Sequence, residues 1–319
     1  MPAASLPRVM ADGPLANAVL EPLAGQVEWL PWTNEPGSDY SEVVAVYTYG
    51  HPHVGGALLD RLPKVRVVSN YGVGVDHIDV KAAAARGIPV GNTPGILDGA
   101  TADMGFTLLL ASARRLIEGD VYARSPQFTA YDPGYMLGRE VHGATLGIIG
   151  MGRIGAQVAK RARGFDMRVL YHNRRPRPEV EAALGVEFTK LDDLLSASDY
   201  VMLCCPLSDA TRGIINRTTL AKMKPTATLV NIARGPVVDT AALYDALAAR
   251  TIAGAGLDVT DPEPLPRDHP LLKLPNVVIA PHLGSATIET RRKMAELSVA
   301  NLLAGLAGKE LPHRVAPPA

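Results

Sequence analysis

The sequence predicts an α/β protein with two doubly wound domains, each a parallel sheet covered by helices. Three observations predict it: the length, the alternation of short apolar runs with helical patterns, and a glycine-rich turn between a strand and a helix. At 319 residues the chain exceeds the roughly 100 to 200 residues of one ordinary domain. Strands that alternate with helices are typical of parallel sheets with helices on both faces.

The first set of elements predicts a flavodoxin-like domain. Its strands are expected in three apolar runs, namely PRVM (7–10), VVAVYTY (43–49) and KVRVVSN (64–70). Helical patterns lie between and after these runs, at Leu15–Leu23, Val54–Leu62 and Val80–Arg86.

The second set predicts a nucleotide-binding Rossmann domain. Six apolar runs are expected to be strands, each followed by a turn or helix. They are TLGIIG (145–150), MRVLYH (167–172), DYVMLCC (199–205), ATLVNIA (227–233), IAGAGLDV (252–259) and NVVIAPH (276–282).

Two longer helical patterns connect the domains. The apolar pattern Asp98–Gly119 follows the turn signal NTPG and predicts a helix that leaves one domain and enters the next, with a hinge near Ile96–Ala100. Ala286–Leu306 predicts a final amphipathic helix whose apolar side carries Met294, Leu297 and Leu302. If this helix packs on the first domain, the nucleotide domain is an insertion. The expected division is then 1–98 with 287–319 for substrate binding and 99–286 for NAD(P) binding.

Composition favours a small-molecule partner. Lys plus Arg equals Asp plus Glu at 32 each, so no net field attracts nucleic acid or an anionic membrane surface. No run approaches the roughly 18 apolar residues of a membrane helix, and MPAASLPRVM has no pattern of an export or transit signal. We therefore expect a soluble, cytoplasmic protein. Cys204 and Cys205 should point to opposite faces of a strand, so neither a disulfide nor a metal site is expected.

A G-x-G-x-x-G element spans Gly150 to Gly155, directly after a predicted strand and at the start of a predicted helix. In this context Gly150 permits the tight turn, Gly152 lets the backbone approach a pyrophosphate, and Gly155 lets helix and strand pack closely. The N-terminus of the helix then supplies an anion site. A glycine-rich turn without a ligand is the alternative, and the strand–turn–helix context disfavours it.

Cofactor choice is expected at the end of the next strand. An Asp or Glu at this place binds the ribose 2′-hydroxyl of NAD. The sequence has Asn173, Arg174 and Arg175 instead, and two adjacent guanidinium groups suit a 2′-phosphate. We therefore expect NADP, with NADPH preferred and NAD possible. The alternative is that these arginines only solvate a surface loop.

Six segments resemble motifs of the D-isomer-specific 2-hydroxyacid dehydrogenase family, in the family's order and over nearly the whole chain. They are NYGVGVDHIDV, NTPG, GIIGMGRIG, NIARGPVVD, GLDVTDPEPLP and NVVIAPHLGSAT. Within the family, the double arginine and the chain length are most similar to the glyoxylate/hydroxypyruvate reductases. The resemblance implies hydride transfer between a nicotinamide cofactor and a small 2-keto acid, giving a D-2-hydroxy acid.

Three residues are the expected catalytic group. Arg234 follows the strand ATLVNIA, where open α/β sheets bind ligands, and its planar fork can bind a carboxylate and polarise a keto oxygen. His282 follows NVVIA and can donate a proton at neutral pH. Glu263 is the matching family position for a carboxylate that orients the imidazole and favours its protonated form. Taken singly, each residue also has an ordinary structural interpretation.

The first domain is expected to bind the substrate. Val73 and Gly74 lie in a glycine-rich turn whose free N–H groups can face an anion, and Thr48 and Tyr49 would line the far wall. The resemblance also implies cofactor contacts from Arg153, Ile154, Cys205, Pro206, Thr211, Ile232, Ala233, Asp258 and Gly284, besides Arg234 and His282. The apolar segment Tyr131–Leu137 resembles the family's dimer arm, so a homodimer is expected.

Several alternatives stay open. In the same class these are a reductase of 2-ketogluconate or another larger 2-keto acid, and phosphoglycerate dehydrogenase, which the absence of a regulatory domain after Leu306 disfavours. Formate dehydrogenases resemble the family but have Gln where Glu263 stands. In a different class, a dinucleotide-sensing corepressor would keep the same cofactor site without turnover.

Overall fold

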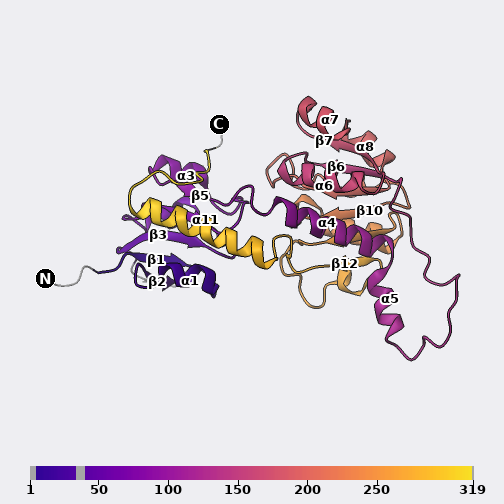
Figure 1. The fold of residues 1–319 in the computed structure, drawn as a ribbon, viewed down its shortest axis with the longest axis horizontal. Coiled ribbons are helices and arrows are strands. Elements are labelled where there is room, and N and C mark those ends of the chain that lie inside the picture. Colours follow the sequence, from indigo (N-terminus) through magenta and orange to yellow (C-terminus); the bar gives the residue numbers. More distant parts are fainter. Residues whose placement is uncertain (1–4, 34–39, 318–319) are drawn as a thin grey trace. The chain divides into compact units, whose positions relative to one another are not determined.

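The computed structural model describes residues 5–33 and 40–317. The chain divides into two compact units (Figure 1): unit 1 is Met1–Leu97 with Thr287–Ala319, and unit 2 is Asp98–Ala286. No helix in the described ranges is both long and apolar enough to cross a membrane.

Unit 1 contains a five-stranded sheet in the order β2-β1-β3-β4-β5, with every neighbouring pair parallel. This is the flavodoxin-like order, so the predicted fold of this unit is confirmed. Its strands are β1 (Arg8–Ala11), β2 (Glu28–Pro31), β3 (Val43–Thr48), β4 (Val68–Asn70) and β5 (Val90–Gly91). Its helices are α1 (Asn17–Leu23), α2 (Gly56–Asp60), α3 (Val80–Ala85) and α11 (Ile288–Leu306).

The last helix, α11, packs on the sheet of unit 1, where it contacts β3, β4, β5 and α1. Buried hydrogen bonds fix its register: the Tyr47 hydroxyl lies 2.7 Å from Ser298 Oγ, and Ser69 Oγ donates to the Ser298 carbonyl at 2.7 Å. Of its expected apolar residues, Met294 and Leu302 are buried, whereas Leu297 is half-buried.

Unit 2 contains a seven-stranded, all-parallel sheet in the order β12-β11-β10-β9-β6-β7-β8. Counted from β6, this is the Rossmann order with one additional strand at the β12 edge, as predicted. The strands are β6 (Thr145–Ile149), β7 (Arg168–His172), β8 (Glu187–Phe188), β9 (Tyr200–Leu203), β10 (Thr228–Asn231), β11 (Gly254–Leu257) and β12 (Val277–Ile279).

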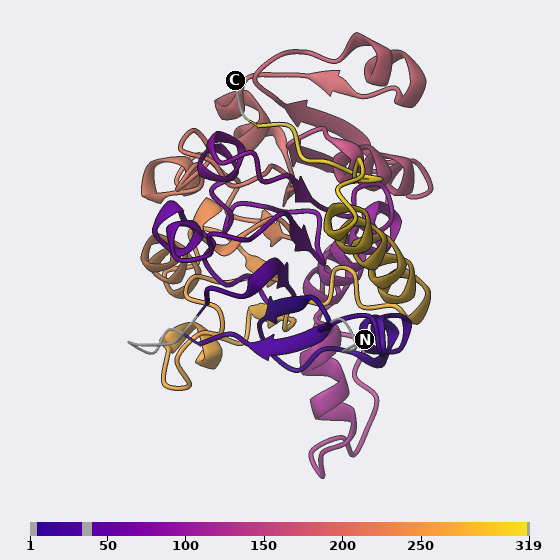
Figure 2. The ribbon, with the colours of Figure 1, turned by 90° about the vertical axis from the view of Figure 1, so that its left-hand side faces the viewer.

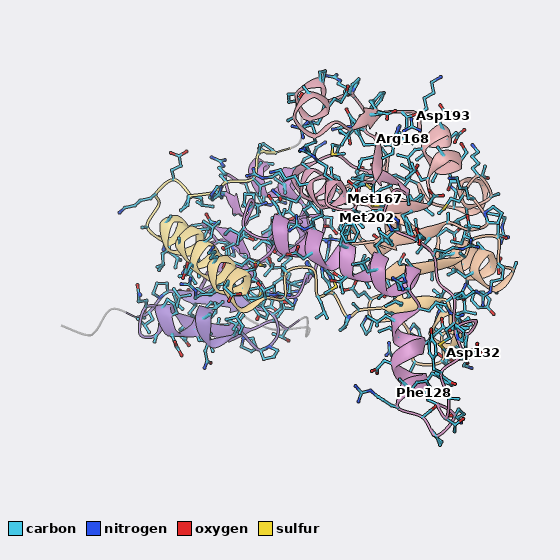
Figure 3. All side chains as sticks on the ribbon, turned by 45° about the vertical axis from the view of Figure 1, so that its right-hand side comes forward. Phe128, Asp132, Met167, Arg168, Asp193 and Met202 are labelled. Carbon is cyan, nitrogen blue, oxygen red and sulfur yellow. The ribbon has the colours of Figure 1, made fainter. Side chains whose placement is uncertain are left out.

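Helices cover both faces of this sheet. They are α4 (Asp98–Ala113), α5 (Leu116–Ala123), α6 (Arg153–Arg163), α7 (Pro178–Leu184), α8 (Leu191–Ala197), α9 (Arg217–Leu220) and α10 (Thr240–Ala248), with 3₁₀ turns η1 (Gly235–Val237) and η2 (Pro270–Lys273). Side chains of α4 and α6 form one apolar cluster with the sheet, and those of α8, α9 and α10 form another. Met202, labelled in Figure 3, is fully buried in the first cluster, where Gly105 of α4 lies against its sulfur.

The two cysteines follow β9 and contact different clusters. Cys204 packs against the α4–α6 cluster and Cys205 belongs to the α8–α10 cluster, which confirms that they face opposite sides of the sheet. Both thiols are free, and burial raises the pKa of Cys205 to about 11.

The prediction of one helix over Asp98–Gly119 is wrong. The chain forms α4, turns at Arg115, whose φ is +50°, and continues as α5. A left-handed residue ends a helix by redirecting the backbone. The chain after α5 returns to the end of α4, where Arg139 N–H donates to the Ala113 carbonyl at 2.8 Å. The strands β2, β5 and β8 were also not predicted. The strands β5 and β8 have only two residues each, and β2 (EWLP) is not an apolar run, since it begins with a glutamate and ends with a proline.

Candidate active site

The glycine turn after β6 is shaped by contacts that exclude a side chain at two positions. Gly150 has φ +101°, and a Cβ there would lie 2.5 Å from the Cys205 amide nitrogen. A Cβ on Gly155 would lie 2.3 Å from the Gly150 carbonyl oxygen. A Cβ on Gly152 would meet nothing within 4 Å. The backbone at Gly152 therefore faces open space at the N-terminus of α6, which is the geometry that an approaching pyrophosphate requires.

The loop after β7 presents two free cations. Asn173 Oδ1 accepts the Met151 N–H at 2.7 Å, so this side chain ties the loop to the glycine turn. Arg174 and Arg175 are exposed, and neither has a hydrogen bond or ion pair with the part of the chain that the structure describes. Uncommitted guanidinium groups are available to bind an anion such as a phosphate.

Arg234 lies directly after β10, in a turn that an asparagine organises. Asn231 Oδ1 accepts the Ala233 N–H at 3.0 Å, and its Nδ2 donates to the Arg234 carbonyl at 2.9 Å. The half-buried guanidinium of Arg234 donates to the Ala233 carbonyl at 2.9 Å. Gly235 then presses against the loop after β11, since a Cβ there would lie 1.9 Å from the Thr260 carbonyl oxygen. This contact fixes the Arg234 turn against the loop that carries Glu263.

His282 and Glu263 meet although they lie on different loops. His282 Nδ1 is 2.7 Å from Glu263 Oε1, and the two side chains are 31% and 41% exposed. The Glu263 loop contains two cis peptide bonds, Asp261–Pro262 and Glu263–Pro264. With Nδ1 bound to a carboxylate, a proton exchanged with a ligand would be carried by Nε2.

Asp258, at the end of β11, is buried and binds the backbone of the His282 loop. Its two carboxylate oxygens accept N–H groups of Leu283 at 2.7 Å and Gly284 at 2.8 Å, and its carbonyl accepts the His282 N–H at 2.9 Å. Burial raises the pKa of Asp258, and the two carboxylate hydrogen bonds oppose that rise. The sequence predicted a cofactor contact here; this positioning role was not predicted.

In unit 1, three carbonyl groups of the loop after β4 are held by asparagine side chains, whereas two of its amides have no acceptor among the described residues. Asn70 Nδ2 donates to the carbonyls of Gly72 and Gly74 at 2.8 and 2.9 Å, and Asn92 Nδ2 donates to that of Val73 at 2.9 Å. Among the described residues, no acceptor lies opposite the N–H groups of Val73 and Gly74. Successive free amides of this kind form an anion site. The two asparagines were not predicted, although Asn70 ends a strand, where ligand-binding groups gather.

Tyr49 follows β3, beside this loop. Its N–H donates to Asp12 Oδ1 at 2.6 Å, and its ring lies 4.7 Å from the ring of Tyr71. Thr48 differs from its expected place on a substrate wall, because it is fully buried and donates to Asn70 Oδ1 at 2.8 Å. Thr48 therefore orients the asparagine that holds the loop.

The other expected cofactor contacts gather at the carboxyl ends of β9, β10 and β12. Thr211 Oγ1 donates to the Pro206 carbonyl at 2.6 Å, while Ile232 and Ala233 are buried. At the start of α6, Arg153 is exposed and lies 3.2 Å from Asp98, and the next residue, Ile154, packs against the α4–α6 cluster. An open helix N-terminus, free cations and a strand-edge wall fit a dinucleotide.

Comparison with known proteins decides the family. Residues 106–284 match the model of the D-isomer specific 2-hydroxyacid dehydrogenase, NAD binding domain. The chain belongs to this family. The family predicted from the motifs is confirmed, and the protein is an NAD(P)-dependent oxidoreductase.

Relatives of this dehydrogenase include two glyoxylate reductases. That of Korarchaeum cryptofilum is 52% identical over 263 residues, which cover 82% of this chain and 79% of that protein. That of Thermococcus kodakarensis is 51% identical over 278 residues, which cover 86% and 83%. Among solved structures, the NADPH-dependent glyoxylate/hydroxypyruvate reductase of Sinorhizobium meliloti in complex with NADP and malonate superposes with a TM-score of 0.89 at 34% identity, covering 98% of each chain.

Proposed function

We propose that this dehydrogenase is an NADPH-preferring reductase of small 2-keto acids, of which glyoxylate and hydroxypyruvate are the first candidates, and that its products are D-2-hydroxy acids. The observation that carries the proposal is the His282–Glu263 pair, 2.7 Å apart, at the same sheet edge as Arg234 and the glycine turn. The glyoxylate reductases among its relatives support the substrate class.

Each residue of the site has a chemical task in this proposal. In unit 1, the amides of Val73 and Gly74 can bind a carboxylate, and in unit 2, Arg234 can polarise a keto oxygen. When bound, the nicotinamide supplies a hydride to C2 of the substrate. His282 Nε2 donates a proton to the oxygen that becomes the hydroxyl, while Glu263 holds Nδ1 and stabilises the charged imidazole before the transfer.

The preference for NADPH rests on the loop after β7. Arg174 and Arg175 have no partner among the described residues, and the residue before them is the neutral Asn173, not an acid. A carboxylate at 173 would repel a 2′-phosphate, whereas two free guanidinium groups attract it. The NADP-bound reductase of Sinorhizobium meliloti, which has the same fold, supports this choice.

A homodimer is proposed from an exposed apolar arm. In Figures 1 and 2, α5 and the chain that follows it extend from the rest of unit 2, and Phe128, labelled in Figure 3, lies on this extension. Tyr131 is 83% exposed and Leu137 is 71% exposed. Other large apolar side chains of the arm are exposed with them, namely Leu116, Ile117, Val121, Phe128 and Tyr135. Contiguous apolar surface of this kind marks an interaction site.

The test is the initial rate of NADPH and NADH oxidation with glyoxylate, hydroxypyruvate, pyruvate and 2-ketogluconate. We expect turnover of the small keto acids with NADPH, and a loss of about 100-fold or more in His282→Ala. Fast turnover of 2-ketogluconate alone would assign a larger substrate. Binding of NADPH with no turnover of any keto acid would favour the corepressor-like alternative.

A second variant tests the cofactor. Arg174→Ala should raise the KM for NADPH by about tenfold and leave that for NADH within about threefold, because only NADPH carries the 2′-phosphate. Equal effects on both cofactors would contradict the preference.

Sedimentation of the wild type and of a Tyr131→Asp/Leu137→Asp variant tests the dimer. We expect the wild type to sediment as a dimer and the variant as a monomer.

A further inference from the structure

The loop between β7 and α7, residues 173–177, is bound at both ends to one residue of the glycine turn. At its start, Asn173 Oδ1 accepts the Met151 N–H at 2.7 Å. At its end, Arg177 Nη1 donates to the Met151 carbonyl at 3.0 Å. Met151 is fully buried between Gly150 and Gly152. Both backbone polar groups of this residue are therefore held by the loop that carries the two free arginines.

Arg177 is itself fixed by contacts within the protein. Its Nε donates to Glu179 Oε1 at 2.7 Å, and its backbone N–H donates to the Tyr171 hydroxyl at 2.6 Å. The Tyr171 hydroxyl in turn donates to Glu181 Oε1 at 2.6 Å, and Tyr171 is fully buried. Because the Arg177 guanidinium binds both the Glu179 carboxylate and the Met151 carbonyl, it has little freedom left to reach a ligand.

Three arginines within four positions thus have two different environments. Arg174 and Arg175 are exposed and without a partner in the described ranges, whereas Arg177 is half-buried and bonded to a main-chain carbonyl and a carboxylate. The loop spans the two places at which an NADP molecule presents negative charge: its 2′-phosphate and its pyrophosphate. One ligand joins these groups, so the two anion sites must be held at a fixed separation.

We propose that Arg177 is a positioning residue that determines cofactor selectivity without contacting the cofactor. By joining the Met151 carbonyl to the end of the loop, it sets the place of Arg174 and Arg175 relative to the pyrophosphate turn. The inference rests on the proposed preference for NADPH. NADH has no 2′-phosphate and does not use the arginine pair, so its binding depends less on this separation.

The experiment measures dissociation constants for NADPH and NADH by fluorescence titration in Arg177→Met and Arg177→Lys. We expect Arg177→Met to weaken NADPH binding by about tenfold and NADH binding by less than about threefold. Arg177→Lys keeps the charge but cannot hold Met151 and Glu179 with one planar fork, so it should restore only part of the affinity. Full restoration by Lys would show that charge alone matters and would overturn the inference.

Salt dependence separates positioning from direct contact. Losing an arginine that touches the phosphate lowers the dependence of NADPH binding on ionic strength, as expected for Arg174→Ala. Arg177→Met should keep the dependence of the wild type while its affinity falls. A slope lowered to that of Arg174→Ala would mean that Arg177 contacts the phosphate, and the positioning role would be wrong.

The control is Arg168→Gln at the start of β7. Arg168, labelled in Figure 3, binds the exposed Glu187 and no other side chain among the described residues. It should leave both dissociation constants unchanged, and thermal unfolding of all variants reveals any general loss of structure. If the wild type binds NADPH and NADH equally, the cofactor proposal fails. If it prefers NADPH, and Arg174→Ala removes the preference but Arg177→Met keeps the ratio, only the present inference fails.

Discussion

Asp258 holds the backbone of His282 in a conformation that this residue would rarely adopt alone. The φ of His282 is +58°, in the left-handed region that residues other than glycine rarely adopt. The Asp258 carbonyl accepts the His282 N–H at 2.9 Å, and its carboxylate accepts the next two N–H groups along the chain. These three hydrogen bonds offset the cost of the left-handed conformation and fix the backbone from which the His282 side chain extends.

Asp258→Asn should therefore lower kcat by about 100-fold, because a small displacement of a catalytic group has an effect of that size. The substitution replaces one acceptor oxygen by an amide N–H₂, which faces the N–H of Leu283 or Gly284 and cannot accept from it. The measurement is the single-turnover rate of NADPH oxidation with saturating keto acid, with thermal unfolding as the control for folding. A wild-type rate in Asp258→Asn would show that the hydrogen bonds of the Asp258 carboxylate are not needed for catalysis.

The same carboxylate predicts a pH dependence of stability. Burial, the largest cause, raises the pKa of Asp258 in the folded protein above its value in the unfolded chain. The folded state then binds a proton at a higher pH than the unfolded state does, so this group favours folding at low pH and its contribution is lost as pH rises through the folded pKa. Relative to Asp258→Asn, the wild type should lose stability as pH rises from about 4. Urea unfolding of both proteins from pH 4 to 7 measures this difference in the free energy of unfolding. A difference that stays constant over this pH range would contradict the prediction.

Glu263→Gln tests the charge at constant geometry. The amide oxygen of glutamine can still accept from His282 Nδ1, at the place where Glu263 Oε1 now lies at 2.7 Å. The negative charge that stabilises the charged imidazole is lost, so kcat for keto-acid reduction should fall by about tenfold or more. The measurement is kcat and KM of both proteins at the same pH. An unchanged kcat would mean that Glu263 only orients the ring.

The order of the strands and the gathering of the polar residues could be predicted because the signals are local. Except for β8, each strand of unit 2 is an apolar run, and Arg234, Asp258 and His282 follow three strands that are neighbours in the sheet. Parallel strands bring their carboxyl ends to one edge, so sequence position alone indicates the site.

What could not be predicted depends on contacts between distant residues. The end of α4 is set by the chain that returns to Ala113, and no breaker at Arg115 announces it. The buried asparagine Asn231 looks like any polar residue at a strand end until its two hydrogen bonds are known. Tertiary structure, not local propensity, decides such features.

Two glycines of one motif should fail in different ways. At Gly152 an added Cβ meets nothing within 4 Å, so Gly152→Ala should keep its thermal stability and lose affinity for NADPH and NADH alike, by about tenfold, because the methyl group enters the space open to a pyrophosphate. At Gly155 the Cβ would lie 2.3 Å from the Gly150 carbonyl oxygen, so Gly155→Ala must push helix α6 from strand β6 and lower Tm by several degrees. Calorimetry and cofactor titration of both variants test the contrast. If Gly152→Ala lost stability while binding NADPH normally, the turn would be structural and the assignment of the pyrophosphate to Gly152 would be wrong.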